Sequence, residues 1–216
     1  MDNLFSYDNI IYRILSKFSE LLFLGILWFV FSIPALTFGA STTSLYYTTN
    51  KVLLKKRGKI WECFWYSFKS NFKQSTLAWL LVFASYALTF INFYILRMLT
   101  SNTGNTYYDY IILAIILLII TTWANYIFFY IARFGNSFLT ILKNAFIIAF
   151  SNLMRSLLLT LLLIVTLIIC YLYFPLIFVT LPAYVCLATK ILECVFCKYI
   201  PLDEHKIEDE TSETEK

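Results

Sequence analysis

The chain has 216 residues, of which 60% are hydrophobic and only 14% are charged. A soluble domain carries about 25% charged residues, so this composition excludes an ordinary soluble protein and indicates one that is built for lipid. Basic residues that alternate with aromatic ones also occur in nucleic-acid-binding proteins. Here they adjoin apolar segments, so lipid headgroups are the simpler counter-charge. We therefore expect a bilayer with an anionic inner leaflet, and no nucleic acid, as the partner of these residues.

Four charge-free apolar stretches predict the membrane spans: residues 21–36, 77–96, 111–132 and 156–189. A spanning helix needs roughly 20 residues. The last stretch would measure about 50 Å as one helix against a hydrocarbon core of about 30 Å, so it must turn back. Tyr173-Phe174-Pro175 is the expected turn, because proline disfavours helix at the residue before it. A cleaved signal peptide is the alternative for the first stretch, but acidic residues precede it and no small-residue cleavage pattern follows.

Positive charge gathers on alternate connections between these stretches. The connection before residue 77 is opposed only by Glu62 and contains seven basic residues: Lys51, Lys55, Lys56, Arg57, Lys59, Lys69 and Lys73. Basic connections remain in the cytoplasm, whereas residues 98–110 contain no lysine or arginine and suit the outer face. Arg133, Lys143 and Arg155 mark the next connection as inside. This pattern predicts a multi-pass protein with a cytoplasmic C-terminus.

The number of membrane-embedded segments is five or six. Five spans that end inside would place the N-terminus outside together with Arg13 and Lys17, in conflict with the charge rule. The conflict disappears if residues 39–55 are also embedded, because both termini are then cytoplasmic. These residues are too polar for lipid contact, but small and hydroxyl side chains allow close helix packing in a bilayer. We favour six segments, and the alternative is a cytoplasmic helix after five spans.

We therefore expect an all-α fold, a polytopic helical membrane protein with five to six membrane-embedded helices plus cytoplasmic amphipathic helices. Residues 1–201 form a single integral membrane domain, with embedded segments near residues 19–36, 39–55, 76–97, 111–132, 156–174 and 176–198. Residues 202–216 hold seven acidic residues and two lysines without apolar periodicity. That composition predicts an acidic disordered tail.

Residues 60–73 show the clearest amphipathic pattern. One helical face carries Ile60, Trp61, Phe64, Trp65, Phe68 and Phe72, and the other carries Glu62, Tyr66, Lys69, Ser70 and Lys73. Aromatic side chains beside lysines suit a helix at the headgroup level of an anionic leaflet, and docking of a cytoplasmic partner is the alternative. The candidate face toward lipid headgroups or a partner comprises Lys69, Lys73, Lys55, Lys56 and Arg57.

The predicted spans lack the residues that carry ion coupling or catalysis. Between residues 21 and 189 every charged side chain lies in or beside a connection, except that Arg97 caps its span. Ion-coupled carriers generally place an ionisable residue at membrane depth. The pair Cys194-x-x-Cys197 and the single histidine, His205, cannot complete a zinc site within the chain, and no catalytic motif is present. We therefore expect no catalytic, cofactor-binding or metal-binding residues and no cofactor.

A distinctive motif follows the first span. Residues 34–47 read Pro-Ala-Leu-Thr-Phe-Gly-Ala-Ser-Thr-Thr-Ser-Leu-Tyr-Tyr, and residues 67–74 read Ser-Phe-x-x-Asn-Phe-Lys-Gln. These stretches resemble the YesL-like family of small bacterial membrane proteins, catalogued as a domain of unknown function, family 624. The motif positions, to which we assign a structural role, are Pro34, Thr37, Gly39, Ala40, Ser41, Leu45, Asn71 and Phe72.

The resemblance implies a location in the cytoplasmic membrane of Gram-positive bacteria. Genes of such proteins often lie beside those for carbohydrate importers of the ATP-binding-cassette (ABC) type and for polysaccharide-degrading enzymes. We therefore expect a non-catalytic accessory or regulatory protein of a carbohydrate ABC-type uptake system, with permease or ATPase subunits as partners. A stand-alone small-solute transporter or channel is the alternative. No pattern of catalytic residues supports a third hypothesis, a membrane-bound enzyme.

Overall fold

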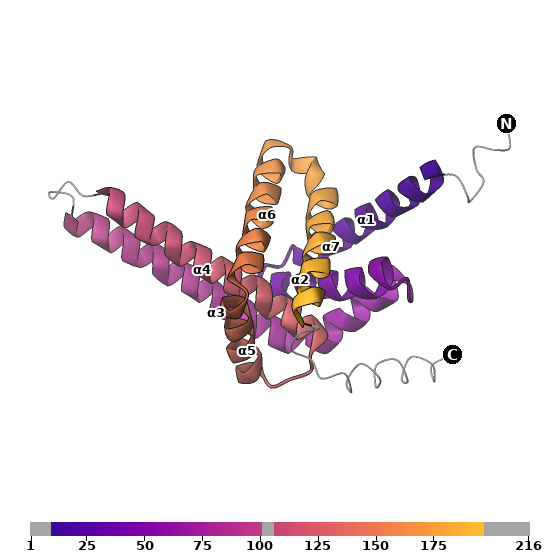
Figure 1. Ribbon diagram of the computed structural model, residues 1–216, viewed down its shortest axis with the longest axis horizontal. Coiled ribbons are helices and arrows are strands. Elements are labelled where there is room, and N and C mark those ends of the chain that lie inside the picture. Colours follow the sequence, from indigo (N-terminus) through magenta and orange to yellow (C-terminus); the bar gives the residue numbers. More distant parts are fainter. Residues whose placement is uncertain (1–9, 101–105, 197–216) are drawn as a thin grey trace.

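The computed structural model describes residues 10–100 and 106–196, with side chains for residues 15–98 and 108–196. Within these ranges the chain is helical apart from short connections and contains no strand (Figure 1). The elements are α1 (Ile10–Ser32), η2 (Ala35–Thr37), α2 (Phe38–Thr48), η3 (Thr49–Leu54), α3 (Ile60–Thr100), α4 (Thr106–Arg133), α5 (Phe138–Ser151), α6 (Leu153–Leu172), η4 (Phe174–Leu176) and α7 (Ile177–Phe196). The predicted all-α fold is confirmed. The predicted tail, residues 202–216, lies outside the described residues.

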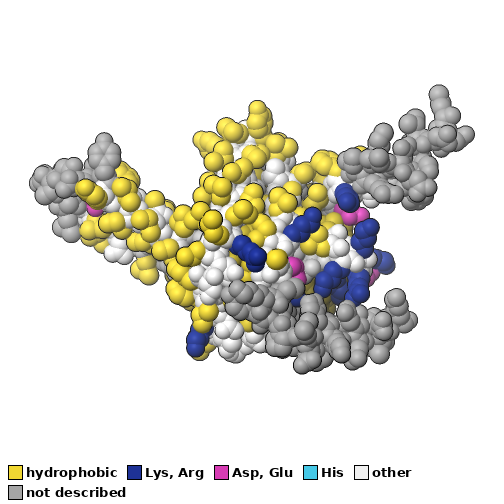
Figure 2. Space-filling model, in the orientation of Figure 1, with side chains coloured by type: hydrophobic (Ala, Val, Ile, Leu, Met, Phe, Trp, Pro, Cys, Tyr) yellow, Lys and Arg dark blue, Asp and Glu magenta, His cyan; other side chains and the backbone are white. Residues whose placement is uncertain are grey.

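Five stretches of helix are long and apolar enough to cross a membrane. They are Leu15–Ser32, Ile60–Met98, Tyr108–Arg133, Leu153–Leu172 and Phe174–Phe196. The α3–α4 hairpin and the α6–α7 hairpin project from a common base that contains α2 and α5 (Figure 1). Figure 2 shows hydrophobic side chains over both hairpins, whereas most Lys and Arg side chains on this face gather over the base. The protein is therefore a polytopic helical membrane protein.

The amphipathic stretch of residues 60–73 and the span after it form one continuous helix, α3. This helix has 41 residues and a length of about 60 Å, twice the thickness of the hydrocarbon core. It continues because neither Gly nor Pro interrupts residues 60–100. The lysines at positions 69 and 73 assign the excess length to the N-terminal part. That part lies in the base, where Tyr66 contacts Tyr47 of α2 and the Ser75 hydroxyl donates to Thr43 of α2.

α2 and the π-helical turn η3 that continues it fill the centre of the base. α2 packs most extensively on α3 and also contacts α1, α4 and α7. Its hydroxyl groups donate to carbonyl oxygens one turn earlier, from Thr43 to Gly39 (2.9 Å) and from Ser44 to Ala40 (2.7 Å). Protein surrounds this segment, so its polar residues need no lipid contact. Residues 38–48 thus form a buried helix, which the half-buried turn of residues 49–54 continues. Together they are shorter than the five candidate spans, and their depth in the membrane stays a prediction.

The inner half of α4 is the core of the base, where every side chain from Tyr126 to Ala132 is buried. α2, α3, α5 and α6 pack around this helix. α5 and α6 are separated only at Asn152, whose φ of −128° and ψ of 50° interrupt the helix. The second hairpin turns at Tyr173 (φ −136°, ψ 82°), and Pro175 lies in the 3-10 turn that leads into α7. The chain thus reverses at the expected Tyr-Phe-Pro sequence.

Candidate functional site

The motif after the first span forms the corner between α1 and α2. Pro34 precedes η2, and the Thr37 hydroxyl lies within hydrogen-bond distance of the carbonyl oxygens of Phe31 (2.6 Å) and Pro34 (2.7 Å). Gly39 faces the backbone of α3, where a Cβ would lie 2.4 Å from the carbonyl oxygen of Ser75. The motif positions buried with it are Ala40, Ser41 and Leu45. These residues hold α2 directly against α1 and α3.

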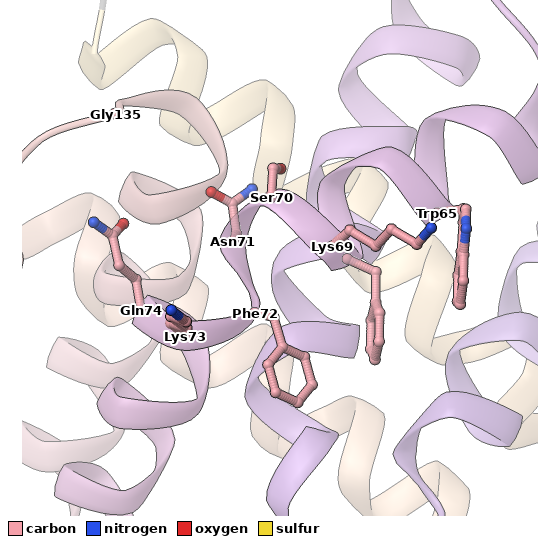
Figure 3. Close-up of a pocket in the computed structure, with 9 residues that line it drawn as sticks. Trp65, Lys69, Ser70, Asn71, Phe72, Lys73, Gln74 and Gly135 are labelled. Carbon is pink, nitrogen blue, oxygen red and sulfur yellow. The ribbon is translucent and has the colours of Figure 1, made fainter.

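A groove of about 700 Å³ runs along α3 beside the connection between α4 and α5 (Figure 3). Residues 68–74 line it together with Trp65 and Gly135. A second hollow continues along the same helix toward Trp61 and shares Trp65, Lys69 and Ser70 with the first. We call the two hollows together the α3 furrow. The furrow therefore follows α3 from Trp61 to Gln74.

Lysine ammonium groups and amides line the furrow. The Lys69 Nζ lies 4.8 Å from the centre of the Trp65 ring, within cation–π range, and the Lys69 side chain remains exposed. Lys73 is also exposed, and Phe72 is 37% exposed. Figure 3 shows Lys69 reaching toward Trp65, with Asn71 on the side of the helix nearer the connection. The furrow therefore offers positive charge and hydrogen-bond donors beside aromatic surface.

The middle of the aromatic face of the same helix packs toward the interior of the protein, whereas Trp61 and Phe72 at its two ends are exposed. The Phe31 ring of α1 packs against four rings of α3, with centroid separations of 6.3 Å to Trp61, 5.6 Å to Phe64, 5.6 Å to Trp65 and 5.1 Å to Phe68. Phe64 is completely buried. Packing within the chain thus occupies the middle of the aromatic face that the sequence pattern offers to lipid headgroups.

The connection between η3 and α3, residues 55–59, carries the other predicted basic side chains. Lys56 and Gly58 have positive φ values of 55° and 81°, and this left-handed backbone reverses the chain within a few residues. Lys59 pairs with Glu62 at 3.1 Å. The exposed basic residues of the connection are Lys55, Lys56, Arg57 and Lys59. They lie at the start of α3, and Lys69 and Lys73 follow three to five turns along the same helix.

A partly buried ion pair at the base was not predicted from the sequence. Glu193 of α7 pairs with Arg133 at the end of α4, and their side chains are 20% and 7% exposed. The Glu193 carboxylate also accepts hydrogen bonds from the Asn50 amide (2.8 Å) and the Tyr46 hydroxyl (3.2 Å). This cluster joins α2, η3, α4 and α7.

The expectation that the spans hold no carboxylate is therefore wrong for the last span. Glu193 lies four residues beyond the charge-free stretch that ends at residue 189, yet inside the predicted segment 176–198 and inside α7. The signal in the sequence was a single acidic residue within a predicted membrane segment, which is a candidate functional position by its cost alone.

Metal-ligating side chains do not cluster among the residues that the structure describes: no three His, Cys, Asp or Glu side chains lie together there. Cys63, Cys170, Cys186 and Cys194 are free thiols. Cys197 and His205 lie outside the described residues.

The comparison with protein families finds a match in the part of the chain that contains these features. The family described as "Protein of unknown function, DUF624" matches residues 21–93, which include most of α1, all of α2 and most of α3. No curated protein and no solved structure matches the chain. The matched residues contain the motif corner, the basic connection and nearly all of the α3 furrow. Residues 21–93 therefore match the DUF624 family, and the predicted resemblance to the YesL-like family is confirmed over these residues.

Proposed function

We propose that the protein is a non-catalytic accessory membrane protein that associates with a carbohydrate ABC-type uptake system, and that the α3 furrow is its docking surface. The observation that carries the proposal is the difference between the two faces of α3. The middle of its aromatic face packs inside the protein around Phe31, while its basic face, with Lys69 and Lys73, is exposed. The choice of a carbohydrate importer follows from the gene neighbourhoods that the family resemblance implies.

Docking explains this face better than lipid anchoring alone. An interfacial helix buries its apolar face among acyl chains and keeps its charged face toward headgroups and water. Here Phe31 of α1 covers the middle of the apolar face of residues 60–73, so mainly its two ends, at Trp61 (49% exposed) and Phe72 (37% exposed), are left for insertion. The exposed basic face of α3 instead suits an acidic segment of a cytoplasmic subunit, held by charge-assisted hydrogen bonds.

The same charges indicate which end of the molecule faces the cytoplasm. The basic connection at residues 55–59 and the furrow lie at one end of the molecule, and the positive-inside rule assigns that end to the cytoplasm. An anionic inner leaflet attracts such a segment by about 1 kcal/mol per basic residue. The ATPase subunits of an importer face the same compartment.

The test is affinity purification from native membranes in mild detergent, followed by mass spectrometry. We expect permease or ATPase subunits with the wild-type protein and their loss with Lys69→Glu/Lys73→Glu. The matched control is Lys143→Glu/Arg155→Glu, which changes charge equally at two exposed residues outside the furrow. If importer subunits still co-purify with the furrow variant, the furrow is not the docking surface. If no importer subunit co-purifies with the wild-type protein, the proposed function is wrong.

A stand-alone transporter is the second candidate, because Glu193 is an ionisable residue shielded between helices. Its carboxylate already has three partners, which favours a structural role. Uptake of labelled sugars into liposomes that contain only this protein separates the two candidates. Transport that is lost in Glu193→Gln, while the variant stays folded, would support the transporter over the accessory protein.

A further inference from the structure

The end of α7 lies beside the α3 furrow. The Phe196 ring packs edge-on against Phe134 (5.7 Å between centroids) and Tyr130 (6.1 Å). Phe134 is followed by Gly135, which lines the furrow, and the Gln74 amide at the furrow's end donates to the Asn136 carbonyl oxygen (3.2 Å). The chain therefore leaves α7 next to the furrow's Gln74 end.

The segment that follows has the opposite charge to the furrow. Residues 202–216 contain seven acidic residues and two lysines, so their net charge is two minus seven, or −5. The surface from the basic connection to the furrow carries Lys55, Lys56, Arg57, Lys59, Lys69 and Lys73 against Glu62, so its net charge is six minus one, or +5. The two charges match in size and differ in sign.

The chain length also fits. Residues 197–202 can cover about 20 Å when extended, which is enough to pass the connection and reach the furrow. The furrow follows α3 from Trp61 to Gln74, a rise of about 20 Å. The fifteen residues from 202 to 216 are therefore more than long enough to lie along it.

We propose that the acidic segment 202–216 of this chain docks in the α3 furrow, where its carboxylates pair with Lys69 and Lys73. The segment thereby shields the basic face of α3 from other anionic groups. In the part of the inference that rests on the proposed function, the docked segment competes with the importer subunit for the furrow and acts as an autoinhibitory contact. Docking itself requires no partner protein.

The test is photo-crosslinking of the full chain in nanodiscs of phosphatidylcholine, with benzoylphenylalanine in place of Ser70 in the furrow. We expect mass spectrometry to find crosslinks from position 70 to peptides of residues 202–216. The matched control position is Ser151, exposed at the end of α5 outside the furrow, where such crosslinks should be absent. Equal crosslinking from both positions would overturn the proposal.

Charge variants then test the contact itself. Lys69→Glu/Lys73→Glu should lower the crosslink yield roughly tenfold, because two ion pairs are lost and two repulsions are added. Lys143→Glu/Arg155→Glu should leave the yield unchanged. High salt should lower the wild-type yield, since 1 M salt shortens the Debye length to about 3 Å. A yield that is insensitive to the furrow charges and to salt would contradict docking by charge.

Anionic lipid is the competing occupant of the furrow. In nanodiscs that contain phosphatidylglycerol, the crosslink from position 70 to residues 202–216 should persist at a similar yield. Its loss there, with retention in phosphatidylcholine, would identify lipid headgroups as the occupant and refute the proposal.

The competition is tested separately in native membranes with a chain that ends at residue 201. We expect severalfold higher recovery of importer subunits than with the full chain. Unchanged recovery, with the crosslink intact, would reject autoinhibition while docking stands. Recovery of no subunit from either chain would count against the proposed function, and it would also reject the competition.

Discussion

Gly25 of α1 lies directly against the backbone carbonyl oxygen of Phe178 in α7, where a Cβ on Gly25 would be only 1.8 Å from that oxygen. In a regular helix the N–H of the residue four positions later bonds this oxygen. That residue is Pro182, which has no N–H. Pro182 thus leaves the carbonyl of Phe178 without its helical donor, and Gly25 lets α1 pack against α7 at that point.

Gly25→Ala should therefore destabilise the protein more than an ordinary surface change. The added methyl group forces α1 and α7 apart, and overpacking of this kind costs about 1–3 kcal/mol or more. Thermal unfolding in detergent, followed by size-exclusion chromatography, measures the loss. Gly135→Ala is the matched control, because a Cβ there meets nothing within 4 Å. Equal stability of the two variants would show that α1 does not pack on α7 in this way.

The ion pair between Arg133 and Glu193 predicts strong coupling. Removing one partner of a fully buried pair leaves an unpaired charge and costs about 3–5 kcal/mol. Because Glu193 is 20% exposed, Arg133→Gln and Glu193→Gln should each lower stability by less than that, but clearly. The double variant should lose much less than the sum of the two single losses. Lys59→Gln, which breaks the exposed pair with Glu62, should cost about 1 kcal/mol or less. Additive losses in the double-mutant cycle would argue against a direct Arg133–Glu193 interaction.

The sequence predicted the features that depend on local composition. Apolar stretches located the candidate spans, and the Tyr-Phe-Pro sequence at residues 173–175 located the second hairpin, because proline acts on its immediate neighbours. Features that depend on which helices meet were missed. The role of Gly25 requires the knowledge that α1 packs on α7 beside Pro182, and the role of Glu193 requires that Arg133 lies opposite it. A sequence pattern shows neither the contact between α1 and α7 nor the contact between Arg133 and Glu193.

The sequence could have predicted that α3 is one continuous helix, because residues 60–100 contain no helix-breaking Gly or Pro. The change from an amphipathic to an apolar pattern near residue 75 marks a change of surroundings, and the backbone continues through it. The residues of the candidate basic face are exposed, and their role stays a prediction. The aromatic face was assigned to lipid because a periodicity cannot show that Phe31 of another helix packs on it.

Membrane topology gives a prediction that is independent of function. Single cysteines in a cysteine-free variant should react with an impermeant thiol reagent from outside at Ser101 or Asn105, and should be protected at Lys56 or Lys143, because basic connections remain inside. Ser101 and Asn105 lie outside the described residues. The reverse labelling pattern would invert the topology. A cysteine at Asp2, also outside the described residues, distinguishes five spans from six, since labelling there from outside favours five.

Phe31 separates internal packing from lipid anchoring of residues 60–73. Its ring contacts four aromatic side chains of α3, so Phe31→Ala should remove a shared packing partner and cost about 2–3 kcal/mol, below the range for a fully buried phenylalanine because Phe31 is only partly buried. The emission of Trp61 and Trp65 should shift to longer wavelength as water enters the gap. Phe23→Ala is the control, because Phe23 is 45% exposed on the apolar surface of the same helix. If residues 60–73 were held by the bilayer instead, Phe31→Ala would leave stability and tryptophan emission unchanged, and brominated lipids would quench Trp61 and Trp65 equally in both proteins. We expect the stability loss and the spectral shift with Phe31→Ala and neither effect with Phe23→Ala.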